Sequence, residues 1–382
     1  MKLSGITIKN YRALEDVRLT FNSGMNVIYG RNGMGKSSVI DLLGFFLAGL
    51  EGAAQEERAR ELVHGCRDIS REISVLAATD QGAKTRISIE PGTGRVTVQG
   101  TARLPIRHLS FTGGMTAQSA PENGGRSGSG GLRGSSVGRR VNLARVKERM
   151  HCAQLAARCG GARGRRVPEA PFRRKMGEAL HRLDAGFGGV RVESGEGGKR
   201  LLVEKNGVFL DAERDLSSGE LLAVGLLAEI CCEACAGPGR GDLVVLVDEI
   251  DISLHPQWQV RMAAILREFF PEVQFVMTSH SPFVWSGMNR EEVVWLDAGD
   301  DGRVYQRPAG SARGESLEGI ATHYFGLDAY DSAFLLDLHK VDVLIELGDG
   351  PAARQAADAL AKRYGGVELV SMLEFRMRLR GL

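Results

Sequence analysis

The chain has 382 residues, which is long for one domain and short for three, so we expect one large domain with appendages. The apolar fraction of 43% and the charged fraction of 25% are ordinary for a globular protein, and a chain of this length can bury a sizeable core. No run of 18 or more apolar residues occurs, and the first residues lack the apolar stretch of a signal peptide. The sequence therefore favours a cytoplasmic protein over one that acts in a membrane.

Charge is distributed unevenly along the chain. The net charge is +2, but the stretch from Thr112 to Lys175 holds 14 Lys and Arg against 3 Asp and Glu, an excess of +11 that leaves −9 for the remainder. Such asymmetry is typical of chains that contact nucleic acid, and we expect any direct contact through Arg126–Lys175.

Six cysteines show no spacing typical of a disulfide framework or a zinc site. We expect reduced thiols, and we interpret the three that share one apolar helical stretch as buried helix residues rather than metal ligands. The cysteines are Cys66, Cys152, Cys159, Cys231, Cys232 and Cys235.

The first part of the chain predicts strands, then a helix, then more strands. Alternating apolar residues over Val17–Phe21 and an apolar run over Met25–Tyr29 indicate strands, and Lys36–Leu50 predicts a helix. Glu72–Val98 predicts two or three short strands, because glycine and proline divide it.

Composition changes near Thr112. The stretch to Arg166 is dense in Gly, Ser and Arg and cannot bury enough apolar surface to order itself, so we expect a mobile segment with one helix over Val141–Ala157. A loop of this length is unusual inside a compact domain. Two interpretations stay open: an insertion with a function, or a stretch foreign to the fold, such as the product of a translation-frame error.

Helices and strands alternate again from Phe172 onward, which indicates a parallel sheet with crossover helices. The last fifty residues predict two or three further helices. The expected helices are Phe172–Leu183, Glu220–Ala236 and Gln257–Phe269, and the expected strands are Val190–Glu193, Leu201–Glu204, Leu243–Val247, Gln274–Thr278 and Val293–Leu296.

The strongest motif is Gly30-Arg31-Asn32-Gly33-Met34-Gly35-Lys36-Ser37, which fits the P-loop pattern G-x-x-x-x-G-K-[ST]. It follows a predicted strand and opens a predicted helix, as a P-loop must. The glycines let backbone N–H groups face phosphates, Lys36 reaches the β- and γ-phosphates, and Ser37 supplies a hydroxyl to Mg²⁺. The sequence therefore predicts an ATP site here.

A second motif ends the predicted strand Leu243–Val247 with two acids, Asp248 and Glu249. In this position Asp248 would hold Mg²⁺ through its water shell, and Glu249 is the natural general base for the attacking water. Two further elements complete the set: Leu216–Glu220, which reads on its own as a helix N-cap, and Thr278–Pro282, which carries His280.

These four elements, in this order, resemble the ABC-type ATPase heads of the SMC, RecF and OLD group. Asn10-Tyr11-Arg12 resembles the N-F-R element that follows the first strand in that group, which makes Arg12 a candidate ATP contact. Glu249–Pro256 resembles the E-P-E-x-x-L-H-P segment of its RecF/OLD branch. The resemblance implies that Leu216–Glu220 contacts the γ-phosphate bound to a second copy, and that His280 senses that phosphate. Gln81, Gln99 and Gln118 stay open as candidates for the Q-loop glutamine.

The resemblance and the motifs together define a candidate site. We expect ATP and Mg²⁺ as cofactors. The expected nucleotide contacts are Arg12, Gly30, Asn32, Gly33, Gly35, Lys36, Ser37, Ser38, Ser217, Ser218 and Gly219; the expected metal-binding residues are Ser37 and Asp248; and the expected catalytic residues are Glu249 and His280.

The C-terminal part is similar to the tails of small anti-phage ATPases of the Septu and retron-associated type, which work with a separate nuclease. This similarity rests on Phe325–Asp328 and on predicted helices over Ala333–Leu347 and Ala352–Tyr364. A helical hairpin that merely caps the head is the alternative. The acids that follow the head do not predict an intrinsic nuclease.

We therefore expect an α/β fold: an ABC-type P-loop ATPase head with a mixed or parallel sheet, interrupted by a Gly/Arg-rich insert and followed by a helical appendage. The expected parts are an N-terminal lobe (1–111), the basic insert (112–184), a C-terminal lobe (185–330) and a helical hairpin (331–382). The expected function is a Mg²⁺-dependent ATPase switch that dimerises on ATP and controls a partner, such as a nuclease in phage defence. A RecF-like DNA-maintenance ATPase and a non-hydrolysing scaffold are the alternatives.

Overall fold

The computed structural model describes residues 1–49, 53–63, 70–100, 106–111, 143–158, 169–195, 198–235, 242–308, 310, 315–325, 332–364, 373 and 377–378. The chain divides into two compact units, Met1–Glu315 and Ser316–Leu382. The boundary expected after residue 330 therefore falls inside the second unit. The expected Gly326–Asp328 element and most of the Gly/Arg-rich stretch, residues 112–142 and 159–168, lie outside the described residues.

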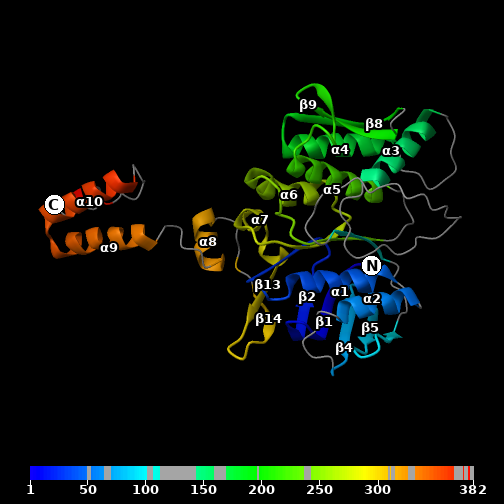
Figure 1. The fold of residues 1–382 in the computed structure, drawn as a ribbon, viewed down its shortest axis with the longest axis horizontal. Coiled ribbons are helices and arrows are strands. Elements are labelled where there is room, and N and C mark those ends of the chain that lie inside the picture. Colours follow the sequence, from blue (N-terminus) through cyan, green and yellow to red (C-terminus); the bar gives the residue numbers. More distant parts are fainter. Residues whose placement is uncertain are drawn as a thin grey trace. The chain divides into compact units, whose positions relative to one another are not determined.

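The elements follow the predicted order closely (Figure 1). The strands of the first unit are β1 (Leu3–Tyr11), β2 (Leu14–Thr20), β3 (Met25–Gly30), β4 (Ile73–Thr79), β5 (Lys84–Ile89), β6 (Val96–Gly100), β7 (Arg107–Phe111), β8 (Phe187–Gly195), β9 (Gly198–Lys205), β10 (Val208–Asp211), β11 (Leu243–Val247), β12 (Gln274–Thr278), β13 (Val293–Ala298) and β14 (Val304–Arg307). Its helices are α1 (Lys36–Ala48), α2 (Ala53–Val63), α3 (Leu143–Arg158), α4 (Glu169–Leu183), α5 (Ser218–Ala234), α6 (Pro256–Phe269), α7 (Pro282–Ser286) and the 3-10 turn η1 (Arg290–Glu292).

A six-stranded sheet in the order β14-β13-β3-β12-β11-β7 forms the centre of the first unit. Within it β13, β3, β12, β11 and β7 run parallel, and only the edge strand β14 is antiparallel. The carboxyl ends of β3, β11 and β12 therefore meet at one edge of the sheet, where ligands bind in folds of this kind. The chain leaves β3 into the P-loop, β11 into Asp248 and β12 into Ser279 at that edge.

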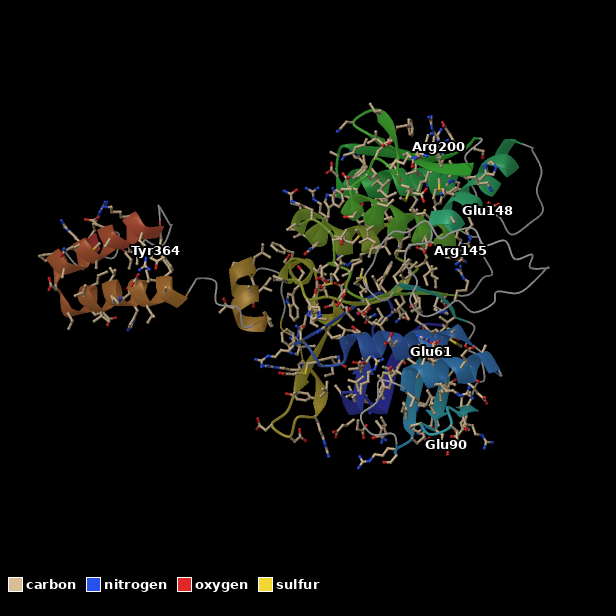
Figure 2. The ribbon with its side chains drawn as sticks, in the orientation of Figure 1. Glu61, Glu90, Arg145, Glu148, Arg200 and Tyr364 are labelled. Atoms are coloured by element: carbon tan, nitrogen blue, oxygen red, sulfur yellow. The ribbon has the colours of Figure 1, made fainter. Side chains whose placement is uncertain are left out.

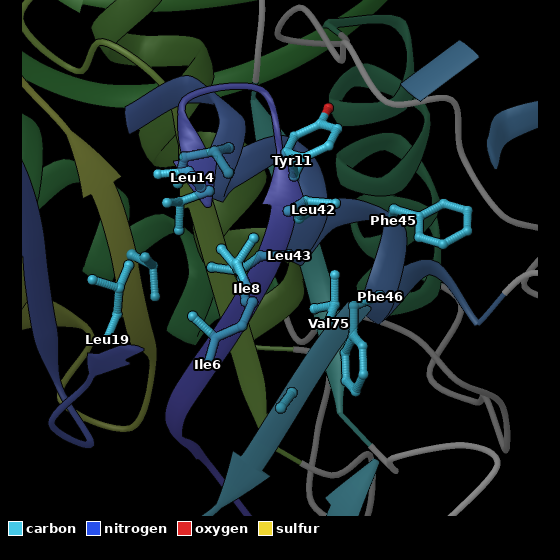
Figure 3. Close-up of a cluster of buried hydrophobic side chains, with 14 of the residues drawn as sticks. Ile6, Ile8, Tyr11, Leu14, Leu19, Leu42, Leu43, Phe45, Phe46 and Val75 are labelled. Atoms are coloured by element: carbon cyan, nitrogen blue, oxygen red, sulfur yellow. The ribbon is translucent and has the colours of Figure 1, made fainter. Parts of the chain in front are cut away.

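Helix α1 lies between this sheet and a second, antiparallel sheet of order β2-β1-β4-β5-β6. Its sequence is apolar nearly all round, and ten of its thirteen residues are buried, as expected for a helix covered on both sides. Figure 3 shows Leu42, Leu43 and Phe46 of α1 grouped with Ile8 of β1 and Val75 of β4 in one core. This packing fixes the start of α1, and with it the P-loop.

Helices α3 to α6 and the three-stranded sheet β10-β9-β8 form the other side of the first unit (Figure 1). Helix α4 packs against β8, α5 and α6, and α5 packs against α3 and β11. Cys231 and Cys232 are buried in α5, as expected, whereas Cys235 is only half-buried and caps the end of that helix. The arrangement places the start of α5 next to the loop that leaves β11, which matters for the site.

Helix α3 departs from the expectation of a mobile segment over Thr112–Arg166. Leu143, Val146 and Met150 are buried, and α3 packs on α5, β8 and β9. Figure 2 shows Arg145 and Glu148 on this helix. The helix expected over Val141–Ala157 is present as α3, and the expectation of mobility is wrong for it because its buried apolar residues pack on the rest of the first unit.

The second unit contains α8 (Leu317–Phe325), α9 (Ser332–Leu347) and α10 (Gly350–Tyr364). Helices α9 and α10 form an antiparallel hairpin around a small core that includes Phe334, Val341, Ile345 and Leu360. In the described part of the chain, no helix is long and apolar enough to cross a membrane.

Candidate nucleotide site

The P-loop connects β3 to α1 through glycines that other residues could not replace. Gly35 caps α1 in a left-handed conformation, with φ +85°, and a β-carbon there would lie 2.7 Å from Cδ2 of Leu14. No side chain among the described residues caps α1 at this end. Its first backbone N–H groups are therefore available to an anion, which the helix dipole also favours.

Lys36 points back into the loop that precedes it. Its Nζ donates to the carbonyl oxygens of Gly30, at 2.8 Å, and Arg31, at 3.0 Å. Burial lowers the pKa of Lys36 to about 8, while the charges of Asp248 and Glu249 oppose that shift. These carbonyls hold the ammonium group beside the space for the phosphates. When a nucleotide binds, phosphate oxygens would replace the carbonyls as partners of the ammonium group.

Ser37 and Asp248 come together from α1 and from the end of β11. The Ser37 hydroxyl donates to Oδ1 of Asp248 at 3.2 Å. A hydroxyl and a carboxylate beside a helix N-terminus form the hard oxygen donor set that Mg²⁺ prefers when phosphates complete its shell. These two residues therefore fit the expected metal.

Glu249 follows Asp248 with a left-handed backbone, φ +56°. Such a conformation is costly for a residue with a β-carbon and is common at functional sites. The backbone N–H of Glu249 donates to the Thr278 hydroxyl at 2.7 Å, and that hydroxyl donates to Oδ1 of Asp248 at 2.5 Å. The side chain of Glu249 is half-buried and lines the same cavity as the P-loop.

Arg12 and His280 approach the P-loop from two other directions. Arg12 lies in the turn between β1 and β2, and its Nη1 donates to Oδ2 of Asp41 at 3.1 Å and to Oγ of Ser38 at 3.4 Å. The backbone N–H of His280 donates to Oδ1 of Asp251 at 3.3 Å. Burial lowers the pKa of His280, and the positive charge of Lys36 lowers it further.

These groups surround one cavity of about 570 Å³. It is lined by Arg12, Ala13, Asn32, Gly33, Gly35, Lys36, Ser37, Ser38, Glu249 and His280. Most residues expected at the nucleotide thus come together from the turn after β1, from the P-loop and the start of α1, and from the loops that follow β11 and β12. Gly30 and Asp248 adjoin the cavity through their bonds to Lys36 and Ser37.

Ser217, Ser218 and Gly219 do not line this cavity. They begin α5, where Ser217 forms a capping box with Glu220, and the side chains of Ser217 and Ser218 are exposed. Gly219 packs on the loop after β11, since a β-carbon there would lie 2.2 Å from the Ser253 carbonyl oxygen. The same residues can therefore cap α5 within their own chain and still present an outward-facing contact for a phosphate.

Sequence reasoning missed Asp41, Asp251 and Thr278, which hold Arg12, His280 and Glu249. Thr278 carried a signal, because it ends a predicted strand just before His280. Of the glutamine candidates, Gln81 lies in the turn after β4 and Gln99 in β6, neither of which lines the cavity. Gln118 lies outside the described residues.

Solved structures with a similar fold include the SMC head bound to the C-winged helix domain of ScpA. That structure shares 15% identity with this chain and covers 80% of it, while 97% of its own length is covered, at a TM-score of 0.53. An SMC head from Pyrococcus furiosus, bound to the C-terminal domain of ScpA, shares 14% identity over 80% of this chain and 96% of its own, at a TM-score of 0.50. The chain therefore has the fold of an ABC-type ATPase head of the SMC kind.

Sequence comparisons place this head among particular relatives. Residues 1–88 match the family described as "AAA ATPase domain", and residues 130–286 match "AAA domain, putative AbiEii toxin, Type IV TA system". The Retron Ec83 probable ATPase of Escherichia coli is 28% identical over 200 residues, which is 49% of this chain and 35% of that protein. The Septu protein PtuA of Bacillus mycoides is 36% identical over 91 residues, 23% of this chain and 13% of that protein.

A third relative is the DNA replication and repair protein RecF of Bacteroides fragilis, 36% identical over 64 residues, which is 17% of each chain. In all three cases the match spans about a third or less of the relative's own length. The expected resemblance to SMC and RecF heads and to anti-phage ATPases is confirmed at the level of similarity.

Proposed function

We propose that the chain is a Mg²⁺-dependent ATPase switch that closes as a dimer around two nucleotides. The observation that carries this proposal is one cavity lined by Lys36 and Ser37 of α1, Glu249 after β11 and His280 after β12, which are three separate segments. Lys36 and the amides of α1 bind the phosphates, and Ser37 and Asp248 would hold Mg²⁺, which would neutralise the charge that develops on them. Glu249 accepts the proton of the attacking water.

A second copy enters the proposal because, among the described residues, Ser217, Ser218 and Gly219 do not line the chain's own phosphate site. The start of α5 is exposed at Ser217 and Ser218 and lies outside the cavity of the same chain. In the proposed dimer, each copy covers the γ-phosphate of the other with Leu216–Glu220. ATP then stabilises the closed state, and loss of the γ-phosphate releases it.

Hydrolysis is tested by measuring phosphate release from ATP with Mg²⁺ and with EDTA. Glu249→Gln keeps the side-chain size and loses the base, so turnover should fall about 10²-fold or more while ATP binding persists. Equal turnover in wild type and Glu249→Gln would remove Glu249 as the base. Absence of turnover in wild type would favour the non-hydrolysing scaffold.

We propose further that this switch controls a partner in anti-phage defence, such as a separate nuclease. Likeness to a retron ATPase and to Septu PtuA supports this pathway. A phage-challenge assay of cells that carry the gene with its neighbours should show protection, and Glu249→Gln should abolish it. Protection that survives Glu249→Gln would separate the pathway from the ATPase cycle.

A RecF-like maintenance ATPase that binds DNA directly is the second candidate, favoured by the RecF match. Four of the cations expected to bind DNA are engaged in ion pairs within the protein. Arg145 and Arg149 bind Glu233, Lys147 binds Glu213 and Lys175 binds Glu272. Direct DNA binding through these four side chains should therefore be weak. Removal of residues 112–142 tests the contribution of that segment, through the salt dependence of DNA affinity.

A further inference from the structure

Thr278 lies beside the end of β11, where the two acids of the site follow the strand. It is the last residue of β12, and it is wholly buried. The parallel register pairs Val247 with Met277, so the residues that follow, Asp248 and Thr278, are neighbours. Core packing alone does not explain a threonine at position 278, because a valine would fill the same volume without burying a hydroxyl.

The Thr278 hydroxyl uses its capacity in a defined direction. Its single proton goes to Oδ1 of Asp248, at 2.5 Å, and its oxygen accepts the backbone N–H of Glu249, at 2.7 Å. The carbonyl of the same residue accepts the N–H of Ile250 at 3.0 Å. One threonine therefore holds three consecutive residues of the loop after β11.

This arrangement bears on the backbone of Glu249, which has φ +56°. A left-handed non-glycine residue persists only where its surroundings fix it. The bonds from Glu249 N–H and Ile250 N–H to Thr278 bracket that residue on both sides. They fix the direction in which the Glu249 side chain leaves the backbone.

The same hydroxyl orients the carboxylate of Asp248. Oδ1 of Asp248 accepts hydrogen bonds from the hydroxyls of both Ser37 and Thr278. Two donors on one oxygen restrict rotation of the carboxylate. Outer partners of this kind typically change metal affinity or activity when they are removed.

We propose that Thr278 is a positioning residue that sets Asp248 and Glu249 together through its hydroxyl. The proposal rests on the proposed function, because it assigns Thr278 a part in the same metal and base arrangement. It predicts that the hydroxyl matters and the methyl group does not. Thr278→Ser should therefore behave as wild type, and Thr278→Val, which keeps the shape, should not.

The experiment compares these two variants with Thr79→Val. Thr79 is also a buried threonine, and its hydroxyl bonds to Ala83 in the turn after β4. This control measures the general cost of removing a buried hydroxyl. Thermal unfolding, ATP affinity in EDTA, Mn²⁺ affinity of the ATP-loaded protein by electron paramagnetic resonance, and turnover are measured for all.

Thr278→Val should lower Mn²⁺ affinity and turnover about 10–100-fold, with ATP affinity in EDTA within about threefold of wild type. Thr278→Ser should stay near wild type, and Thr79→Val should lose melting temperature without losing Mn²⁺ affinity. Wild-type Mn²⁺ affinity in Thr278→Val would overturn the proposal, as would equal loss in Thr278→Ser. If wild type itself releases no phosphate, the proposed function fails, and Mn²⁺ affinity still decides the role of Thr278.

Discussion

At the scale of single residues, Lys36 is the side chain on which nucleotide binding should depend most directly. Its ammonium group already sits in the P-loop, held by Gly30 and Arg31. Lys36→Ala removes a charge-assisted contact to phosphate, so it should abolish ATP binding in calorimetry. The melting temperature of the nucleotide-free protein should stay nearly unchanged. Lys9→Ala, at an exposed lysine of β1, is the control. Wild-type affinity in a folded Lys36→Ala protein would refute the P-loop assignment.

His280 gives a prediction for pH. Burial lowers its pKa in the folded protein, so the unfolded chain binds more protons at acid pH. The contribution of neutral His280 to stability is therefore complete above pH 7 and is lost as pH falls below about 6.5. Urea unfolding of wild type and His280→Gln, from pH 7.5 to 5.5, should show a smaller acid loss in the variant. Parallel curves would mean that His280 does not titrate in this way.

The residues of the cavity could be named from the sequence because their chemistry imposes a local pattern. A P-loop needs glycines at fixed positions before Lys36, and the base must follow Asp248 at a strand end. Of the partners that hold them, Asp41 has no such pattern, and Thr278 is marked only by its place at the end of a predicted strand just before His280. They become neighbours only when β12 pairs with β11 and the turn after β1 folds over α1.

At the scale of elements, Glu233 connects α5 to α3 and to β7 through ion pairs. Its nearly buried carboxylate accepts from Arg145 at 3.0 Å, Arg149 at 2.5 Å and Arg107 at 3.3 Å. Glu233→Gln removes the negative charge that three guanidinium groups share, so it should destabilise the protein by roughly 3 kcal/mol in denaturant unfolding. Glu148→Gln, at the exposed pair with Lys199, should change stability by less than about 1 kcal/mol. Equal effects in the two variants would show that the Glu233 cluster is not a structural link.

Long periodic elements were predictable, and short paired ones were not. Helices such as α5 and α6 and apolar strands such as β11 and β12 carry their own pattern, and the sequence placed them within a few residues. Strand β7, Arg107–Phe111, has a mixed composition and was not predicted. Its strand conformation comes from pairing with β11, far along the chain, which no local pattern records.

At the scale of the whole molecule, the proposed ATPase switch requires two copies of the chain to share each nucleotide. One chain brings together the P-loop, Asp248, Glu249 and His280, but its own Ser217 and Ser218 lie at the exposed start of α5. An arginine at Ser218 would meet the partner's bound phosphate site with a bulky side chain where a small hydroxyl is expected. Ser218→Arg should therefore block closure without changing ATP binding to the single chain.

The most direct measurement is light scattering of Glu249→Gln with saturating ATP and Mg²⁺. Because this variant binds ATP and hydrolyses it slowly, it should accumulate as a dimer with ATP and return to the smaller species with ADP. The double variant Glu249→Gln with Ser218→Arg should stay at the smaller species under the same conditions. A Glu249→Gln protein that binds ATP without dimerising, or a dimer that Ser218→Arg leaves unchanged, would contradict the shared-nucleotide account.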